Sequence, residues 1–329
     1  MNMKVRIFTE GGADIGFGHI ARCLSLYQAF EEKGIKPLFV VNGDKSVYQY
    51  LKNTRHELVN WLEKDPSAFL ADADIVIVDS YLAGSGFYDK VSKAAKVPVY
   101  LDDNKRLDYP KGVVVNGTIF AEELGYPDKN NITYLLGSRY IPLRKTFWNL
   151  PAKEVKKDIQ SVLISFGGDD SRNLTPVIAA SLKRNFPEYR LKIIIGSAFK
   201  YVAQIESLKN SNTKLIYSPG AEGMKQAMIE SDMAISAAGQ TLYEFARVGL
   251  PVIAIAVVEN QMNNVRGWLK AGFIEYAGWW EEHEIPSKIS ASIRLLEDRD
   301  IRQLRSTTGR KLVDGRGAGR IAEEILRKI

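Results

Sequence analysis

Short apolar runs alternate with stretches of helical periodicity along the whole chain. Five β-rich runs lie in the first half, at residues 5–8, 38–41, 75–78, 97–101 and 113–115. Five more follow in the second half, at residues 161–166, 192–195, 214–217, 233–236 and 252–257. Strands that alternate with helices in this way are typical of a doubly wound parallel sheet. The pattern therefore predicts an α/β fold.

The alternation of strands and helices is interrupted between the first five and the last five predicted strands. Pro151 and the charged stretch 153–158 interrupt the alternation, which indicates a linker near residues 147–157. We predict a Rossmann-like N-terminal domain at 1–147 and a Rossmann-like C-terminal domain at 148–329, the latter ending in a closing helix. Two such domains facing one another would form a cleft at the carboxyl ends of both sheets, where these folds bind ligands.

Composition narrows the class of protein. The longest apolar run, 250–258, is far shorter than the roughly 20 residues that a membrane-spanning helix needs, and no signal-peptide pattern is present. We therefore expect a cytoplasmic protein without membrane insertion. Cys23 is the only cysteine, which excludes an internal disulfide and a cysteine-based zinc site. The net charge of +6 suits an anionic ligand, but no basic run is interleaved with stacking aromatics, so nucleic acid is not an expected partner.

The stretch Gly16-Phe17-Gly18-His19 lies where an apolar strand meets a helical pattern. A glycine turn lets the backbone approach a ligand closely, and the positive end of the helix disfavours imidazolium. His19 is therefore predicted to be a neutral ring that acts as a general base. Alternatively, the glycines form only a tight connection and His19 caps the helix. A nicotinamide site is disfavoured, since Ala21 stands where the dinucleotide fingerprint needs a third glycine.

A second turn with small residues precedes a helix in the second half. Ala238, Gly239, Gln240 and Thr241 lie between a strand and that helix. Exposed backbone N–H groups and the helix dipole at such a turn suit a diphosphate, although a compact connection needs the same residues.

Further polar residues lie beside the predicted strands of the second half. Glu244 lies one turn inside the helix, and Asn260 and Gln261 follow the next strand, where they are predicted to reach the same ligand. A third turn, Gly167-Gly168, is predicted to line the same site or to open a helix through an Asx-type turn.

Seven segments occur in the order found in a known family. They are residues 15–20, 79–81, 101–103, 115–117, 137–144, 166–169 and 237–261. In these segments the chain resembles the UDP-sugar hydrolases of pseudaminic acid biosynthesis and the related spore-coat polysaccharide proteins. The resemblance implies a GT-B-like fold with UDP held mainly by the C-terminal domain.

The resemblance also implies a reaction, the hydrolysis of UDP-2,4-diacetamido-2,4,6-trideoxy-β-L-altropyranose or a close UDP-sugar to free sugar and UDP. His19 would activate water, and Asp79 and Tyr81 would hold the sugar or the water. Glu244 matches the ribose-contacting glutamate. Arg22 and Asn116 lie within or beside matching segments and are expected to bind substrate. Backbone N–H groups near Gly239 could meet the charge of the departing UDP, so no metal or other cofactor is expected.

Two other functions remain open at this point. In a GT-B glycosyltransferase that uses a UDP-sugar donor, His19 would deprotonate an acceptor hydroxyl instead of water. A non-enzymatic UDP-sugar-binding protein would keep the nucleotide site without turnover. The sequence does not determine the oligomeric state.

Overall fold

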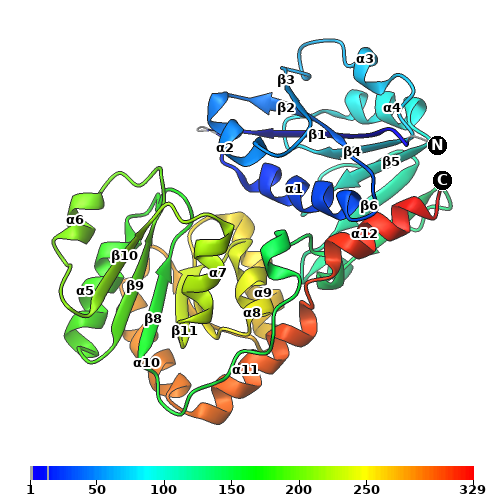
Figure 1. Ribbon diagram of the computed structural model, residues 1–329. Helices are drawn as coiled ribbons and strands as arrows, with labels where there is room; N and C mark the ends of the chain where they lie inside the picture. The colour runs from blue at the N-terminus through cyan, green and yellow to red at the C-terminus, as the bar shows by residue number, and fades with distance from the viewer. Residues whose placement is uncertain (1–2, 13–14) are drawn as a thin grey trace. The chain divides into compact units, whose positions relative to one another are not determined.

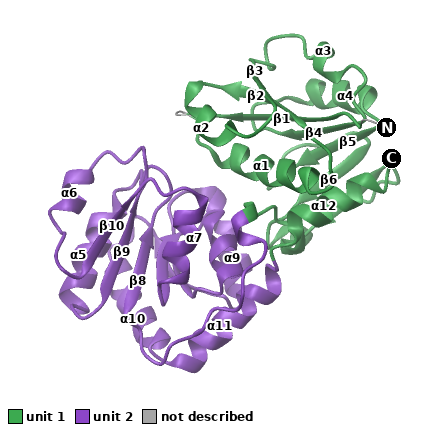
Figure 2. Ribbon diagram, viewed as in Figure 1, with its two compact units in different colours: residues 1–145, 315–329 green, residues 146–314 purple. Residues whose placement is uncertain are grey.

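The chain divides into two compact units. The structure is a computed structural model that describes residues 3–12 and 15–329. Unit 1 consists of residues 1–145 and 315–329, and unit 2 of residues 146–314 (Figure 2). Both units are α/β, as the sequence predicts.

Unit 1 is built on a seven-stranded parallel sheet with the order β3-β2-β1-β4-β5-β6-β7 (Figure 1). The strands are β1 (Val5–Gly11), β2 (Leu38–Gly43), β3 (His56–Leu58), β4 (Ile75–Asp79), β5 (Val97–Leu101), β6 (Gly112–Asn116) and β7 (Ile132–Leu136). The helices are α1 (Gly18–Glu31), α2 (Tyr48–Leu51), α3 (Ser67–Leu70), α4 (Ser85–Ala94) and α12 (Gly317–Leu326). Short 3-10 turns are η1 (Lys45–Val47), η2 (Ala121–Leu124), η3 (Ser138–Tyr140) and η4 (Lys145–Phe147), the last of which crosses the unit boundary.

Unit 2 repeats this architecture with six parallel strands in the order β10-β9-β8-β11-β12-β13. The strands are β8 (Ser161–Ser165), β9 (Arg190–Ile195), β10 (Thr213–Tyr217), β11 (Met233–Ala237), β12 (Val252–Ala256) and β13 (Ile274–Trp279). The helices are α5 (Leu174–Asn185), α6 (Val202–Glu206), α7 (Ala221–Ile229), α8 (Thr241–Val248), α9 (Met262–Lys270), α10 (Ile285–Leu296) and α11 (Arg299–Leu312), and η5 (Glu259–Gln261) is a 3-10 turn.

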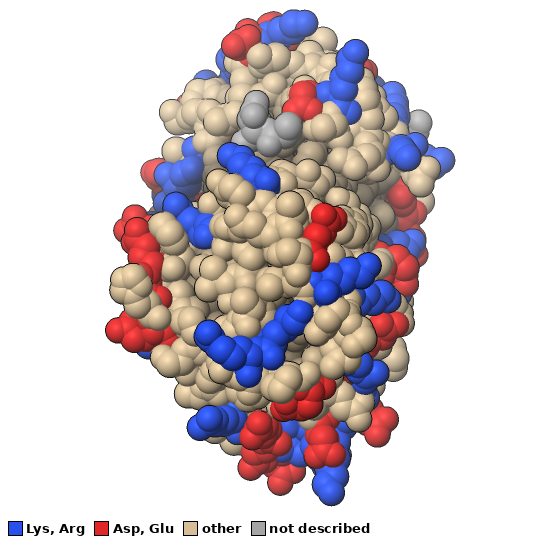
Figure 3. All heavy atoms as spheres, turned by 90° about the vertical axis from the view of Figure 1, so that its left-hand side faces the viewer, with Lys and Arg blue, Asp and Glu red and all other residues tan. Residues whose placement is uncertain are grey.

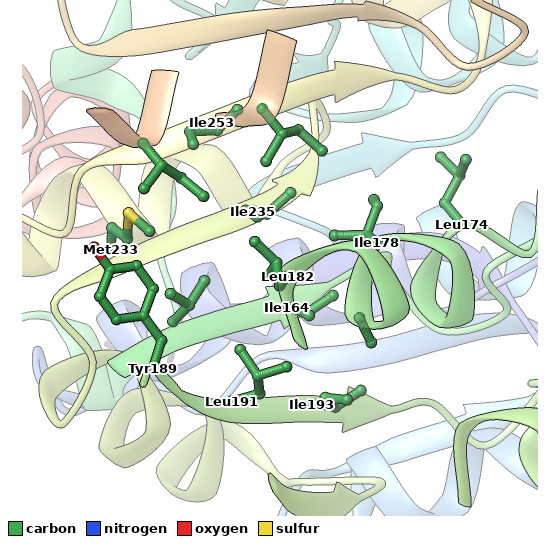
Figure 4. Close-up of a cluster of buried hydrophobic side chains, with 14 of the residues drawn as sticks. Ile164, Leu174, Ile178, Leu182, Tyr189, Leu191, Ile193, Met233, Ile235 and Ile253 are labelled. Carbon is green, nitrogen blue, oxygen red and sulfur yellow. The ribbon is translucent and has the colours of Figure 1, made fainter. Parts of the chain in front are cut away.

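The core of unit 2 shows why these segments form helices and strands. Leu174, Ile178 and Leu182 recur every four residues along α5 and pack on apolar side chains of the sheet (Figure 4). The central strands β8 and β12 are buried along their whole length, which makes them continuous apolar runs in the sequence.

All ten predicted strands are present, and three strands were not predicted. β3 has three residues and β7 has five, and each lies at an edge of the unit 1 sheet. β13 lies at an edge of the unit 2 sheet, and its pairing with β12 shifts register between Ala254 and Ile255. Edge strands are only partly covered, so their sequences carry a weak apolar pattern.

The C-terminal helix belongs to unit 1, contrary to the predicted domain division at residue 147. α12 packs against α1, and Lys33, in the turn just after α1, pairs with Glu323 of α12 at 2.8 Å. Arg320 Nη1 donates to the carbonyl of Arg139 at 2.9 Å. A Cβ on Gly317 would lie 2.1 Å from the carbonyl oxygen of Ile141, so the backbones meet closely there. The apolar face of α12 is thus buried against the first domain rather than the second.

The strand orders place one topological switch point in each unit. The order reverses between β1 and β4 in unit 1, and between β8 and β11 in unit 2. Open α/β sheets bind ligands at the carboxyl ends of the strands at such points. In unit 1 the loops there precede α1 and α4, and in unit 2 they precede α5 and α8.

Basic and acidic side chains both occur on the face drawn in Figure 3. Among residues 3–12 and 15–329, the helices are all too short or too polar to cross a bilayer.

Candidate active site

His19 and Asp79 meet at the switch point of unit 1. His19 is the second residue of α1, and Asp79 is the last residue of β4, 60 positions later in the chain. His19 Nδ1 lies 2.7 Å from Asp79 Oδ1. An ionised carboxylate only accepts, so Nδ1 carries the proton and Nε2 is the nitrogen with the free lone pair. The side chain of His19 keeps 12% of its surface exposed, so the ring is mostly but not completely buried.

Arg22 holds Asp79 in place from the next turn of α1. Its Nε donates to Asp79 Oδ2 at 2.8 Å and its Nη2 to Asp79 Oδ1 at 2.5 Å. Its Nη1 donates to Asp103 Oδ1 at 2.5 Å. We expected Arg22 to bind substrate, but its guanidinium is engaged by two carboxylates of its own unit. These contacts hold the Asp79 carboxylate in place.

Tyr81 completes the cluster from the loop after β4. Its hydroxyl donates to Asp103 Oδ2 at 2.8 Å, and its ring lies edge-on to the His19 ring with 4.7 Å between centroids. The residue is 44% exposed, whereas Asp79 is 1% exposed. Asp79 thus reaches His19 and Arg22 rather than solvent, whereas Tyr81 is exposed enough to contact a ligand directly.

The protonation of this cluster differs from the prediction made for His19. Burial lowers the pKa of His19, but the adjacent Asp79 carboxylate raises it by more, so the net pKa lies above the usual value. The start of α1 was expected to lower it. That expectation is wrong because a full charge at hydrogen-bond distance outweighs the partial charge of a helix end. Burial raises the pKa of Asp79, but Arg22 and His19 together hold it well below its usual range.

A buried glutamate that sequence analysis overlooked links β1 to the loop after β4. Glu10, in β1, is fully buried. Its Oε1 accepts from the backbone N–H of Tyr81 at 2.7 Å, and its Oε2 accepts from the Ser80 hydroxyl. Asp103 was also overlooked as a site residue. A carboxylate at the end of a buried strand is the signal that could have indicated both.

The glycine turn leaves space in front of α1. Gly12 and Gly16 exchange backbone hydrogen bonds of 3.1 and 2.8 Å, and Gly16 has a φ of +85°, which favours glycine. A Cβ on Gly18 would meet none of the described atoms within 4 Å. The N-cap residue Phe17 makes no side-chain hydrogen bond to the first turn. Gly16 and Gly18 thus shape an open helix start next to His19.

Asn116 does not face this opening. It is fully buried, its Oδ1 accepts from Thr118 N and Oγ1 at 3.0 and 2.7 Å, and its Nδ2 donates to the Tyr126 hydroxyl at 3.0 Å. The side chain shapes the loop after β6, contrary to the predicted role in substrate binding.

In unit 2 the start of α8 offers backbone donors. The first-turn amides of Leu242 and Tyr243 bond back to Gly239 and Gln240 at 3.1 Å each. Within the described part of the chain, the N–H groups of Gly239, Gln240 and Thr241 have no protein acceptor. Ala238 is different, since its N–H donates to Ile255 O at 2.9 Å. The α8 start is therefore suited to an anion.

Gln261 lies beside this helix start. Its Oε1 accepts from Val257 N at 3.0 Å, and its Nε2 would lie 3.5 Å from a Cβ on Gly239. Asn260 is exposed within η5, and Glu244 is half-buried in the first turn of α8. The residues predicted to bind nucleotide in the last third of the chain therefore come from adjacent segments.

The Gly167-Gly168 turn lies in the loop between β8 and α5, and Asp170 of the same loop reaches the start of α5. Asp170 Oδ1 accepts from Leu174 N at 3.0 Å and Oδ2 from Thr175 N at 2.9 Å, so a carboxylate already occupies that helix start. Gly167 has a φ of +75°, and both glycines are exposed. They lie at the switch point of unit 2, as does the turn at residues 238–241 before α8. Among the described residues, no group of three or more His, Cys, Asp or Glu is arranged to hold a metal ion.

The resemblance stated from the sequence is confirmed by comparison with known proteins. Residues 162–312 match the glycosyltransferase family 28 C-terminal domain. The chain is 23% identical to the spore coat polysaccharide biosynthesis protein SpsG of Bacillus subtilis, with 97% of this chain and 96% of that protein covered. It is 22% identical to the UDP-2,4-diacetamido-2,4,6-trideoxy-β-L-altropyranose hydrolase of Campylobacter jejuni, with 83% and 99% covered.

The relatives also differ from this chain in length, and solved structures share its fold. The chain spans only 58% of an uncharacterized Methanocaldococcus jannaschii protein to which it is 23% identical over 82% of its own length. Among solved structures, Acinetobacter baumannii MurG superposes with a TM-score of 0.68 at 16% identity over 99% of both chains. The chain is therefore a relative of the spore-coat polysaccharide and UDP-altropyranose hydrolase proteins, with a GT-B-like fold of two parallel α/β units.

Proposed function

We propose that this chain is an enzyme that acts on UDP-sugars, and that it hydrolyses UDP-2,4-diacetamido-2,4,6-trideoxy-β-L-altropyranose, or a close UDP-sugar, to free sugar and UDP. The names of the relatives support the substrate class. The observation that carries the reaction is the His19–Asp79 pair, whose 2.7 Å contact leaves Nε2 as the basic nitrogen.

The residues of unit 1 supply the base in this proposal. His19 Nε2 takes a proton from water as the water oxygen bonds to the anomeric carbon. Asp79 fixes the tautomer and stabilises the imidazolium that forms, and Arg22 keeps Asp79 ionised. Tyr81, which is exposed beside His19, contacts the sugar. Gly16 and Gly18 admit the ligand to the helix start.

The residues of unit 2 bind the nucleotide in this proposal. The bond between the anomeric carbon and the phosphate oxygen breaks, and its electron pair leaves with UDP. The N–H groups of Gly239, Gln240 and Thr241 accommodate the negative charge of UDP. Glu244 accepts from the ribose hydroxyls, and Asn260 and Gln261 add amide contacts. Gly167 and Gly168 let the nucleotide approach the backbone. The proposal assigns no step to a metal.

Turnover of the UDP-sugar by purified protein tests the reaction. In ¹⁸O-labelled water, hydrolysis at the anomeric carbon places the label in the free sugar and not in UDP. His19→Gln should lower kcat by about 10²- to 10⁴-fold, the usual contribution of a general base. His283→Gln, in which an exposed histidine of unit 2 is changed, serves as the matched control. Full activity in the His19 variant would eliminate the assigned base.

A glycosyltransferase remains the second candidate, because residues 162–312 match a glycosyltransferase domain. In that case UDP release requires an added acceptor, and no label from water enters the sugar. Tight UDP binding with no turnover across a UDP-sugar panel would instead identify a binding protein.

A further inference from the structure

Arg172 lies in an unusual position at the carboxyl edge of the unit 2 sheet. It is exposed in the loop between β8 and α5, yet its guanidinium carbon lies 4.2 Å from the centre of the Trp280 ring, just after β13. Its Nε donates to the carbonyl of Val257, just after β12, at 3.3 Å. A stacked guanidinium with one anchored nitrogen has lost most of its rotational freedom. The side chain is therefore held in place before any ligand binds.

The anchor joins Arg172, in the loop after β8, to Val257, just after β12. β11 lies between β8 and β12 in the sheet, so this contact connects the loops on either side of the carboxyl end of β11. The turn at residues 238–241, which leads into α8, begins at the carboxyl end of β11. Val257 N donates to Gln261, whose amide nitrogen lies next to Gly239. A continuous set of contacts thus joins Arg172 to the backbone donors of α8.

Within the described part of the chain, the hydrogen bond of Arg172 uses Nε, and its terminal nitrogens make none. The two nearby helix starts also differ. Asp170 already fills the start of α5, whereas the start of α8 keeps three N–H groups without a protein acceptor. A ligand with two adjacent anionic groups would satisfy both the α8 amides and a guanidinium fork.

We propose that Arg172, stacked on Trp280, binds the diphosphate of the nucleotide through its terminal nitrogens. This inference rests on the proposed function, because it assumes that UDP binds at the switch point of unit 2. It adds a residue that neither the glycine turns nor the Glu244 pattern indicates. Trp280 acts as a positioning residue that orients the guanidinium.

Binding of UDP and of uridine to the full chain tests the assignment. For Arg172→Ala we expect the Kd for UDP to rise roughly ten- to a hundred-fold, the usual effect of a lost hydrogen bond to a charged group. The Kd for uridine, which has no phosphate, should stay within about twofold of the parent. Arg172→Lys should recover only part of the UDP affinity, since lysine lacks the planar fork. Arg184→Ala removes the same charge from the exposed far end of α5 and should leave both constants unchanged.

The outcomes separate this assignment from the proposed function. UDP binding by Arg172→Ala within twofold of the parent overturns the role of Arg172 and leaves the proposed function standing. An equal loss of affinity for UDP and uridine also overturns it, because the arginine would then contribute to binding of the nucleoside or to folding and not to binding of the diphosphate. Failure of the unsubstituted chain to bind UDP overturns both. Thermal unfolding of each variant confirms that the binding constants refer to folded protein.

Discussion

Replacement of Asp79 by asparagine removes the charge at the centre of the unit 1 cluster while keeping its shape. In the native cluster Asp79 Oδ1 accepts from His19 Nδ1 at 2.7 Å and from Arg22 Nη2 at 2.5 Å, and Oδ2 accepts from Arg22 Nε at 2.8 Å. Asparagine retains one acceptor oxygen. Its amide group would then point a donor at a donor of His19 or Arg22.

The expected loss in the free energy of unfolding follows from these contacts. A lost hydrogen bond to a charged group is worth about 1.5–3 kcal/mol, and a buried ion stripped of its partner costs about 3–5 kcal/mol. Arg22 keeps its 2.5 Å contact with Asp103, so it still has one carboxylate partner. We therefore expect the free energy of unfolding of unit 1 to fall by about 2–3 kcal/mol.

The same change should lower the pKa of His19. Burial and the Arg22 charge, which both lower that pKa, remain, whereas the carboxylate that raises it is gone. The carboxylate also selects the tautomer, and the equivalent Asp→Asn change in serine proteases lowers kcat about 10⁴-fold. Turnover of the variant should therefore fall by more than its loss of stability explains.

Urea unfolding and NMR titration of the histidine rings provide the assay, with His19→Gln used to assign the His19 resonance. Asp108→Asn is the matched control, because that carboxylate pairs with Lys129 on the surface with 78% of its side chain exposed. The control should change the unfolding free energy by less than about 0.5 kcal/mol. An unchanged or higher pKa for His19 in Asp79→Asn, with stability equal to the control, would refute the reasoning.

Two further predictions concern stability. Because the pKa of His19 is raised in the folded chain, protonated His19 favours folding below its unfolded pKa near 6.5, and this contribution disappears as the pH rises through the folded value. The difference in unfolding free energy between the parent and His19→Gln, measured by urea unfolding at several pH values, should therefore shrink as the pH rises above about 6.5, and a growing difference would contradict the pKa direction. Gly317→Ala places a Cβ 2.1 Å from the Ile141 carbonyl oxygen, so it should lower the melting temperature and speed proteolysis of the C-terminal segment, at a cost of about 1–3 kcal/mol. Gly319→Ala, where a Cβ meets no described atom within 4 Å, is its control, and equal behaviour of the two variants would contradict the docking of α12 on unit 1.

The sequence by itself determined the elements whose pattern is local. Each buried central strand is a continuous apolar run, so residues 75–78 and 252–257 indicated strands β4 and β12 correctly. Glycine at positions 16 and 167 marked turns that need a positive φ, and His19 was correctly placed at the start of a helix. These properties depend only on neighbours within a few positions of the chain.

Only the tertiary structure decided which side chains meet. Asp79 lies 60 positions from His19 and Asp103 lies 81 positions from Arg22, yet these contacts determine the direction of the His19 pKa and the role of Arg22. The same applies to α12, whose apolar face could have packed on either unit, and to Asn116, whose side chain is used within its own loop. Coulomb energies and packing depend on distance in space rather than along the chain, so no local pattern could have contained them.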